Sequence, residues 1–357
     1  MRRIRGSERS GNAGTFDDGP VTVGGRFGRG RFDERGRGDD GGGFGRPDAG
    51  PDLIFRTVDG SGTNAANPDW GAVGQELVRL VPAAFEDGIG APVTDRPGPR
   101  EISNAVSLQD GEEPNSFGVN DLFWVWGQFV DHDLDLTEAG MTDYAPILVP
   151  AGDPTFAEGT EIPFFRVDPL EGSGVDSVRS YPNQITAFID ASMVYGSDAE
   201  TAAALRDGAK LRLTTDGLLL ETEDGVLAGD VRAAENVGLT ALQTLFAREH
   251  NRLVDVLASE DPTLSEDELF AAARMRVEAE VQAITYNEWL PLLVGEDALD
   301  RYRGFDPDAN PGISVEFSTA AYRFGHSLLS SLWKPARPAK RLDNQDSENT
   351  RYLRLKS

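Results

Sequence analysis

Apolar residues recur at helical spacing in two segments near the middle of the chain. In 118–136 they return every three or four positions, and the same pattern reappears in 239–257. In the second segment the apolar stripe is formed by Leu242, Leu245, Phe246, His250, Leu253 and Leu257. Both segments are therefore predicted to be helices that bury one face against the rest of the protein.

A third helix is bounded by signals at both ends. Ser265 and Glu268 have the spacing of a capping box, in which each side chain accepts a hydrogen bond from the backbone of the other residue. A helical pattern follows over 269–290, and Pro291 is predicted to end it because proline disrupts a helix interior. Few segments alternate in the manner of strands, so the fold class predicted is mainly α, with long loops and little β structure.

The amino-terminal end of the chain differs in composition from the middle. Residues 1–50 are rich in glycine and poor in residues that form a core, so this segment is predicted to be disordered. Its Arg/Gly-rich stretch 26–32 is interpreted as a solvated linker, with an RNA-binding tail as the alternative. The folded domain is predicted to occupy 51–333, where turn-rich loops precede the helical segments.

The carboxyl-terminal segment 334–357 reverses the charge of the rest of the chain. It holds seven Lys and Arg residues against three Asp and Glu residues, whereas the whole chain has a net charge of −26. Two interpretations stay open for this segment, a basic tail or a sequence that has left its original reading frame.

Composition excludes several kinds of chemistry. The chain has no cysteine, which rules out disulfides, thiolate metal ligands, iron–sulfur clusters and cysteine nucleophiles. The strong negative charge disfavours a nucleic-acid partner, since phosphates would be repelled. No apolar run is long enough to cross a bilayer, and the first residues lack the apolar core of a standard secretory signal, so we expect a soluble, globular protein.

Only three histidines are present, and the surroundings of His132 are the most informative. It lies between Asp131 and Asp133, and Gln128 precedes it by one helical turn on roughly the same face. A histidine flanked by acids usually lies on a helix surface. This helix also carries several large aromatic residues, so the polar cluster is expected to be buried, and burial requires partners or a function.

Three other polar positions have both a functional and a structural interpretation. His326 follows Gly325, which allows a flat ligand to approach, although a hydrogen-bonded core histidine has the same pattern. Arg232 and Glu235 lie at i and i+3, the spacing of an intrahelical ion pair. His250 lies on an apolar stripe and is interpreted as a structural, hydrogen-bonded core residue.

The segment 186–192 offers oxygen atoms at every second position. Its donors would be the Thr186 hydroxyl, the Phe188 carbonyl, the Asp190 carboxylate and the Ser192 hydroxyl. Hard oxygen ligands of this kind suit Ca²⁺ once a second carboxylate is added from elsewhere. A short strand is the alternative, because strands also have a period of two.

These motifs, taken in this order, resemble the animal-type haem peroxidases of the peroxidase–cyclooxygenase superfamily. The resemblance covers about 55–329 and includes the loop sequence Asp-Gly-Ser-Gly at 59–62 and the helical sequence Arg-Glu-His-Asn-Arg-Leu at 248–253. It implies a mainly α haem-binding domain. It also implies an enzyme that reduces hydrogen peroxide through a compound I intermediate while it oxidises phenols or halides.

By this resemblance the catalytic residues would be His132, Arg232 and Gln128. His132 would take a proton from hydrogen peroxide and return it to the leaving oxygen, which requires a neutral imidazole at the start. Arg232 would stabilise the developing negative charge, and Gln128 would hold water or a halide in the same pocket.

The resemblance also implies how haem b would be held. His326 would be the proximal iron ligand, and Asp131 and Glu235 would be able to form ester links to haem methyl groups. Asn236 stands where a relative has methionine. The sulfonium link of that relative is therefore not expected, and neither is efficient chloride oxidation.

Calcium would be bound beside the distal helix. Asp133 would point away from the haem and supply the second carboxylate of the calcium site. The other ligands would be Thr186, the Phe188 carbonyl, Asp190 and Ser192. Since His132 and Asp133 are neighbours, bound calcium would orient the distal helix. Calcium and peroxide chemistry favour an extracellular or extracytoplasmic location.

The chain departs from the family pattern on the proximal side. In these peroxidases the proximal histidine donates a hydrogen bond to an asparagine far downstream, whereas the candidates here, Asn344 and Asn349, lie in the basic tail. One interpretation is a working peroxidase with a short proximal side. The other is a truncated or frameshifted protein with impaired activity and a binding or vestigial role.

A fatty-acid dioxygenase of the same superfamily is a third interpretation. Such enzymes have a tyrosine three residues before the proximal histidine. Here Arg323 takes that position, and Tyr322 lies four residues before His326. The resemblance therefore favours a peroxidase over a dioxygenase.

Overall fold

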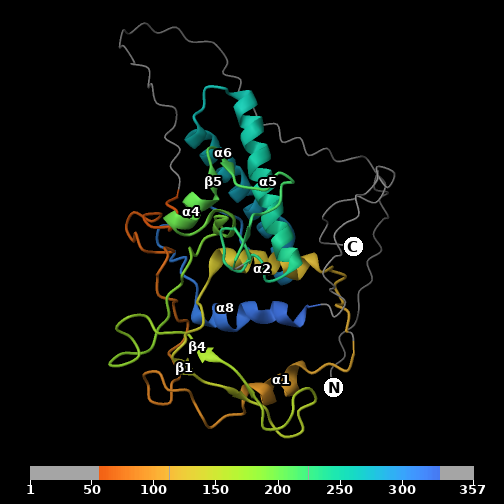
Figure 1. Cartoon of the computed structure of the whole chain (residues 1–357). Coiled ribbons are helices and arrows are strands. Elements are labelled where there is room, and N and C mark those ends of the chain that lie inside the picture. The colour runs from red at the N-terminus through yellow and green to blue at the C-terminus, as the bar shows by residue number, and fades with distance from the viewer. Residues whose placement is uncertain (1–55, 112, 224, 330–357) are drawn as a thin grey trace, which may run out of the picture. The chain divides into compact units, whose positions relative to one another are not determined.

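A computed structural model describes residues 56–111, 113–223 and 225–329 (Figure 1). The predictions for 1–50 and 334–357, including those for Asn344 and Asn349, lie outside the described residues. Among the described helices, none combines the length and the apolar character that a membrane span requires.

Helices supply most of the regular structure. The α-helices are α1 (Pro99–Ser107), α2 (Leu122–Leu134), α3 (Ser192–Tyr195), α4 (Ala199–Leu205), α5 (Val237–Glu260), α6 (Glu266–Ile284), α7 (Leu290–Val294) and α8 (Val315–Thr319). A π-helix, η1 (Thr285–Trp289), joins α6 to α7, and a 3₁₀ helix, η2 (Ala321–Ser327), follows α8.

The strands are short and pair only as two-residue antiparallel ladders. They are β1 (Asp143–Tyr144) with β4 (Phe165–Arg166), β2 (Ile147–Leu148) with β3 (Glu161–Ile162), β5 (Arg206–Asp207) with β6 (Lys210–Leu211), and β7 (Glu221–Thr222) with β8 (Gly225–Val226). Ladders of this length stabilise loops rather than form a core. The prediction of a mainly α fold with little β structure is therefore confirmed.

The main hydrophobic core lies where α2 meets α5 and α6. In Figure 1, α5 and α6 lie on one side of α2 and α8 lies on the other. The ring of Phe246 from α5 packs against Phe129 and Trp126 from α2, with ring centroids 5.3 Å and 5.9 Å away. Val277 and Val281 of α6 are fully buried in the same core. These contacts hold α2 rigidly from its apolar side.

The periodicity located the two central helices well. The segments predicted at 118–136 and 239–257 form α2 and α5. Five of the six predicted stripe residues of α5 are buried, but Leu245 is 44% exposed, so its inclusion in the stripe was wrong. Leu245 lies at the edge of the apolar face, where spacing alone does not separate a core position from a boundary position.

The third helix, α6, begins as predicted and ends at Ile284, earlier than predicted, but helical structure continues through η1 and α7 to Val294. Ser265 accepts a hydrogen bond from the Glu268 backbone, and Glu268 accepts one from the Ser265 backbone, so the capping box is confirmed. Pro291 does not end the helical run, because it lies in the first turn of α7, where its missing N–H costs nothing. The π turn of η1 separates this new start from α6.

Gly127 allows α2 to approach the π-helix closely. A Cβ atom on Gly127 would lie 3.1 Å from the indole of Trp289. That indole is held in place, since its Nε1 donates to the Phe123 carbonyl at 2.8 Å. On the side of η2, the Tyr322 hydroxyl donates to the Gly127 carbonyl at 2.9 Å. The missing side chain of Gly127 therefore leaves room for the Trp289 indole, and its carbonyl binds Tyr322 on the other side.

His250 is a structural core residue, as predicted. It is fully buried, and its Nε2 lies 3.0 Å from the Ala209 carbonyl. Since a carbonyl only accepts, Nε2 must carry the proton, and Nδ1 then accepts from the Tyr195 hydroxyl at 3.0 Å. The histidine therefore joins α3, α5 and the loop between β5 and β6.

Replacement of Tyr195 by phenylalanine should destabilise the protein by about 1–3 kcal/mol, because the buried His250 Nδ1 loses its hydrogen-bond donor. Chemical denaturation would measure the difference. Tyr302→Phe is the matched control, since Tyr302 is 83% exposed and its loss of a hydroxyl should change stability by less than about 0.5 kcal/mol. Equal effects of the two substitutions would contradict the assignment.

Candidate active site

The second half of α2 buries a row of ionisable side chains. The buried residues are Asp131, His132, Asp133 and the helix cap Asp135, none of them more than 4% exposed. The helix ends at Leu134 because Asp135 is extended, and its N–H still closes the last turn on the Asp131 carbonyl. Burial of so many charges is costly unless each group is paired or neutral. The partners of each residue therefore define the site.

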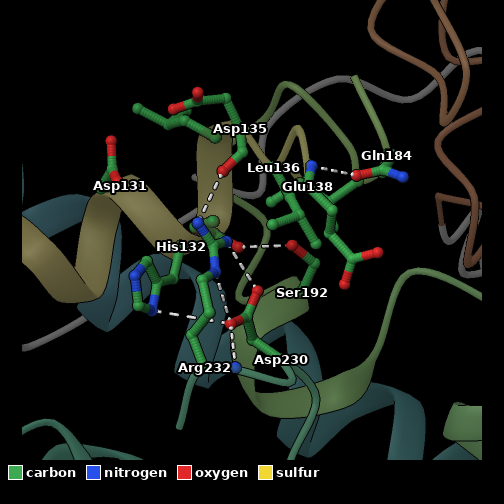
Figure 2. A network of polar contacts seen from close by, with 12 residues as sticks. Asp131, His132, Asp135, Leu136, Glu138, Gln184, Ser192, Asp230 and Arg232 are labelled. Carbon is green, nitrogen blue, oxygen red and sulfur yellow. Dashed lines mark hydrogen bonds and ion pairs between the residues drawn. The ribbon is translucent and has the colours of Figure 1, made fainter. Parts of the chain in front are cut away.

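His132 lies between two carboxylates. Its Nδ1 is 3.6 Å from Asp230, and its Nε2 is 3.9 Å from Glu235. Burial, and next the positive charge of Arg232, lower the pKa of His132 to about 3. The imidazole is therefore neutral near pH 7, with Asp230 on one side of the ring (Figure 2).

Arg232 is fixed by two neighbours. Its Nε and Nη2 donate to the two oxygens of Asp230 at 2.9 Å and 2.7 Å, and its Nη1 donates to the Asp135 carbonyl at 3.1 Å (Figure 2). The residue lies in a turn before α5, so the intrahelical ion pair with Glu235 does not form. Asp230 also accepts a hydrogen bond from the Arg232 backbone. It is a stronger partner of Arg232 than the Asp135 carbonyl, because both of its carboxylate oxygens accept from the guanidinium.

Gln128, Glu235 and Asn236 form a second polar row beside His132. The Gln128 side chain donates to Glu235 at 2.8 Å and accepts from Asn236 at 2.7 Å. Asn236 also caps α5, because its side-chain oxygen accepts from the Leu239 backbone at 2.9 Å. The glutamine is thus held between the start of α5 and the face of α2.

Asp131 lies on the side of α2 that faces η2. Its Oδ2 accepts from Arg323 at 3.3 Å, while its Oδ1 is buried and has no hydrogen-bond partner among the described residues. Burial, and next the repulsion from Asp135, raise the pKa of Asp131 to about 7, although Arg323 opposes the shift. A buried oxygen without a partner marks a place where a further group would fit.

Asp133 faces away from His132 and joins α2 to the loop before α3. Its two oxygens accept from the Ala191 backbone at 3.0 Å and the Ser192 hydroxyl at 2.8 Å. Burial, and next the negative charge of Asp190, raise the pKa of Asp133 well above its usual value. Ala191 has a φ of 58°, a left-handed conformation that is strained for a residue with a side chain.

Asp190 lies in the same buried environment as Asp133. Its Oδ1 accepts from the Thr186 hydroxyl and the Ser192 backbone, both at 3.1 Å, and its Oδ2 is 3.4 Å from Arg56. The segment 186–192 is irregular and ends in α3, so it is not the short strand that was the alternative. In the described part of the chain, no group of three or more His, Cys, Asp or Glu side chains is arranged so that it could hold a metal ion. Any cation here would therefore depend on hydroxyl and main-chain oxygens.

His326 lies on η2, four residues after Tyr322. Its side chain is exposed, and the described residues provide no hydrogen bond to its ring. Tyr322 and Arg323 on the same short helix contact α2. The structure thus brings η2 to the face of α2 that carries Asp131.

The structure brings most of the predicted residues together in two groups. The first contains Gln128, Asp131, His132, Arg232 and Glu235, and the second contains Asp133, Thr186, Asp190 and Ser192.

Sequence reasoning missed the roles of Asp230, Asp135, Arg323 and Asn236. Asp230 had a usable signal, since it precedes Arg232 by two residues and can bond both its backbone and its side chain. Chemically, the first group combines a buried neutral base, a fixed cation and an amide beside a half-exposed carboxylate.

Comparisons with known proteins agree on one family. The model of the animal haem peroxidase family matches residues 55–356. The peroxidasin homolog of Mus musculus is 34% identical over 341 residues, which cover 78% of this chain and 23% of that protein. Eosinophil peroxidase of Homo sapiens is 34% identical over 334 residues, which cover 77% of this chain and 47% of that protein. The chain therefore spans about a quarter to a half of the length of these relatives.

Solved structures point the same way. Peroxidase A from Dictyostelium discoideum has a TM-score of 0.67 and 27% identity, and the match covers 76% of this chain and 59% of that one. A fatty acid alpha-dioxygenase from Arabidopsis thaliana has a TM-score of 0.57 and 26% identity, with 68% of this chain and 38% of that one covered. The peroxidase is the better structural match of these two.

The rings of His132 and His250 should stay neutral well below pH 6, because burial lowers their pKa values to about 3 and about 4. NMR titration of the histidine ring protons would test this, with His132→Gln and His250→Gln to assign the signals. Between about pH 6.5 and 4 these two histidines bind protons in the unfolded chain but not in the folded chain, so their contribution to stability should fall as the pH decreases, while Asp131, whose pKa is raised, contributes in the opposite direction. A midpoint near 6.5 for His132 would contradict its burial.

Proposed function

The chain belongs to the animal haem peroxidase family, and on that premise we propose that it is a haem-dependent peroxidase that reduces hydrogen peroxide while it oxidises a phenol or a halide. The observation that carries the proposal is the buried, neutral His132 beside the fixed cation Arg232. A neutral imidazole is what a proton acceptor for peroxide requires.

The position of Asp230 supports a particular tautomer of His132. Its carboxylate lies 3.6 Å from Nδ1, which is too long for a hydrogen bond but close enough to favour a proton on that nitrogen. Nε2 then has a free lone pair on the side of Glu235 and Gln128. In the proposed reaction Nε2 accepts the proton of the first peroxide oxygen and returns it to the second, which leaves as water.

In the proposed reaction Arg232 takes no part in the transfer of the peroxide proton. Its guanidinium is fixed by Asp230 and the Asp135 carbonyl, so no reorientation is needed when negative charge develops. The same positive charge keeps the pKa of His132 low, which prevents loss of the base by protonation. Gln128 supplies an amide beside Nε2 that orients water or the peroxide.

The described residues fit a haem on the distal side. The unpartnered Asp131 Oδ1 and the half-exposed Glu235 are the carboxylates that would form ester links, and His326 would be the proximal ligand. Haem b, when bound, supplies the two electrons that reduce peroxide and recovers them from the reducing substrate. The exposed ring of His326 is open to a ligand, which supports this assignment over a core role.

The second group of residues would hold Ca²⁺. Asp133 and Asp190 place two carboxylates in one buried environment, where burial, and next the negative charge of Asp190, raise the pKa of Asp133. A divalent cation would remove that cost and would use hard oxygen ligands of the kind present. The remaining ligands would be the hydroxyls of Thr186 and Ser192 and the Phe188 carbonyl. Calcium use supports an extracytoplasmic location.

Two alternatives remain distinguishable from this proposal. A truncated protein with impaired activity would fail to hold haem or would hold it without reacting with peroxide. A fatty-acid dioxygenase has less support, because Arg323 precedes His326 by three residues and pairs with Asp131, and the Tyr322 hydroxyl donates to the Gly127 carbonyl. Formation of a lipid hydroperoxide from linoleate and oxygen would favour the dioxygenase.

His132→Ala should slow the reaction with hydrogen peroxide by about 100- to 10,000-fold, because the proton acceptor is lost. The protein would be loaded with haem and calcium, and the change of the Soret band after mixing with peroxide would give the rate. The Soret band itself should remain in His132→Ala and disappear in His326→Ala. A normal rate in His132→Ala would refute the role of the base, and absence of haem binding by the unmodified chain would favour the impaired protein.

Calcium that is added back to chelator-treated protein should raise its melting temperature, because the cation relieves the repulsion between Asp133 and Asp190. At a free concentration of 100 times Kd the gain is about 2.7 kcal/mol. Asp133→Asn and Asp190→Asn should each weaken the response. Asp255→Asn is the control, since that carboxylate is exposed and pairs with Lys210. A response that survives both substitutions would place the calcium elsewhere.

A further inference from the structure

The side chain of Asn236 contacts both the start of α5 and the side chain of Gln128. The Asn236 oxygen accepts from the Leu239 backbone at 2.9 Å, and its nitrogen donates to the Gln128 oxygen at 2.7 Å. The Gln128 nitrogen in turn donates to Glu235 at 2.8 Å. Three polar side chains are thereby linked in a row that begins at a helix terminus. The meaning of this row for the reaction rests on the peroxidase proposed above.

The helix terminus determines the direction of every hydrogen bond in the row. The first N–H groups of a helix have no partner within it, so the side chain at the cap must present an acceptor. The Asn236 oxygen therefore faces Leu239, which leaves only its NH₂ group to face Gln128. A donor there requires the Gln128 oxygen, and the Gln128 NH₂ group must then face Glu235.

The orientation of Gln128 decides what the proposed site offers to a ligand. The Glu235 oxygen accepts one hydrogen of its NH₂ group, and the other hydrogen has no partner among the described residues. The same Glu235 oxygen lies 3.9 Å from His132 Nε2, so the Gln128 NH₂ group and the nitrogen that would receive the peroxide proton are both neighbours of one carboxylate oxygen. Rotation of the amide by half a turn would replace this donor with a carbonyl oxygen.

We propose that Asn236 is a positioning residue, which uses its role as the cap of α5 to hold Gln128 as a hydrogen-bond donor toward the distal ligand. Ligands that accept hydrogen bonds, such as peroxide or a halide ion including fluoride, then bind more tightly than ligands that only donate hydrogen bonds. Serine at position 236 would keep the cap, since its hydroxyl accepts from the same backbone, but its side chain is too short to hold Gln128. Alanine would lose both contacts.

The first experiment compares Asn236→Ser, Asn236→Ala and Gln128→Leu in the haem-loaded protein, with fluoride as the probe because it is a strong hydrogen-bond acceptor. Soret titration should give a fluoride Kd that is about fivefold to tenfold higher in all three variants. Only Asn236→Ala should also lower the melting temperature, by roughly 2–4 °C, because only it loses the cap. An unchanged fluoride Kd in Asn236→Ser, together with a raised Kd in Gln128→Leu, would overturn the proposal.

A second experiment needs no haem and separates this proposal from the peroxidase itself. In protein labelled with ¹⁵N at glutamine side chains, Gln128→Leu identifies the Gln128 NH₂ signals. The Gln128 hydrogen that faces Glu235 should exchange with solvent at least about tenfold faster in Asn236→Ser than in the unmodified protein, because the amide is no longer held at its oxygen and can rotate away from Glu235. Equal exchange rates would overturn the proposal, whether or not haem binds. Faster exchange without any haem binding would uphold it and refute the peroxidase.

Discussion

The burial of Asp133 against the loop before α3 is the constraint on which the rest of the site depends. Its two oxygens receive hydrogen bonds from Ala191 and Ser192, and this contact fixes the rotation of α2 about its own axis. Because residues on a helix change direction by about 100° per position, one fixed residue fixes its neighbours. His132 is therefore turned toward Asp230, and Asp131 toward η2. The strained backbone of Ala191 belongs to the same contact, since its N–H must face the carboxylate.

The net charge around His132 depends on how many carboxylates surround each of two cations, Arg232 and Arg323. Arg232 and Arg323 both lie close to α2, but their charges are shared among Asp131, Asp135 and Asp230. Because those carboxylates retain the cations, His132 experiences positive charge on its flanks and loses its own proton readily. Burial is the largest cause of the low pKa of His132, the positive charges of Arg232 and Arg323 add to it, and the negative charge of Asp230 opposes it. Since the cations are held by side chains of other elements, this balance requires the folded protein.

The sequence was informative where a local pattern determines the structure. Helical spacing located α2 and α5, and the capping box located the start of α6, because these signals act within a few residues. The end of that helical run was wrong because a π turn before Pro291 depends on how Trp289 packs against α2. Arg323 was missed because its partner Asp131 lies 192 residues away, and the local spacing of Asp230 and Arg232 does not reveal that Asp230 also lies beside His132. The exposure of Leu245 and the place of Arg232 in a turn likewise follow from tertiary packing.

Gly127 has a consequence for how this part of the protein can change in evolution. It lies one residue before Gln128, and a methyl group there would press on an indole that is already tied to Phe123. A larger residue at 127 is therefore acceptable only if position 289 becomes smaller at the same time. The two positions are 162 residues apart in the sequence, yet the residue at one restricts the residue at the other. The packing on the apolar side of α2 thus restricts mutation next to the polar side, where the chemistry is proposed to occur.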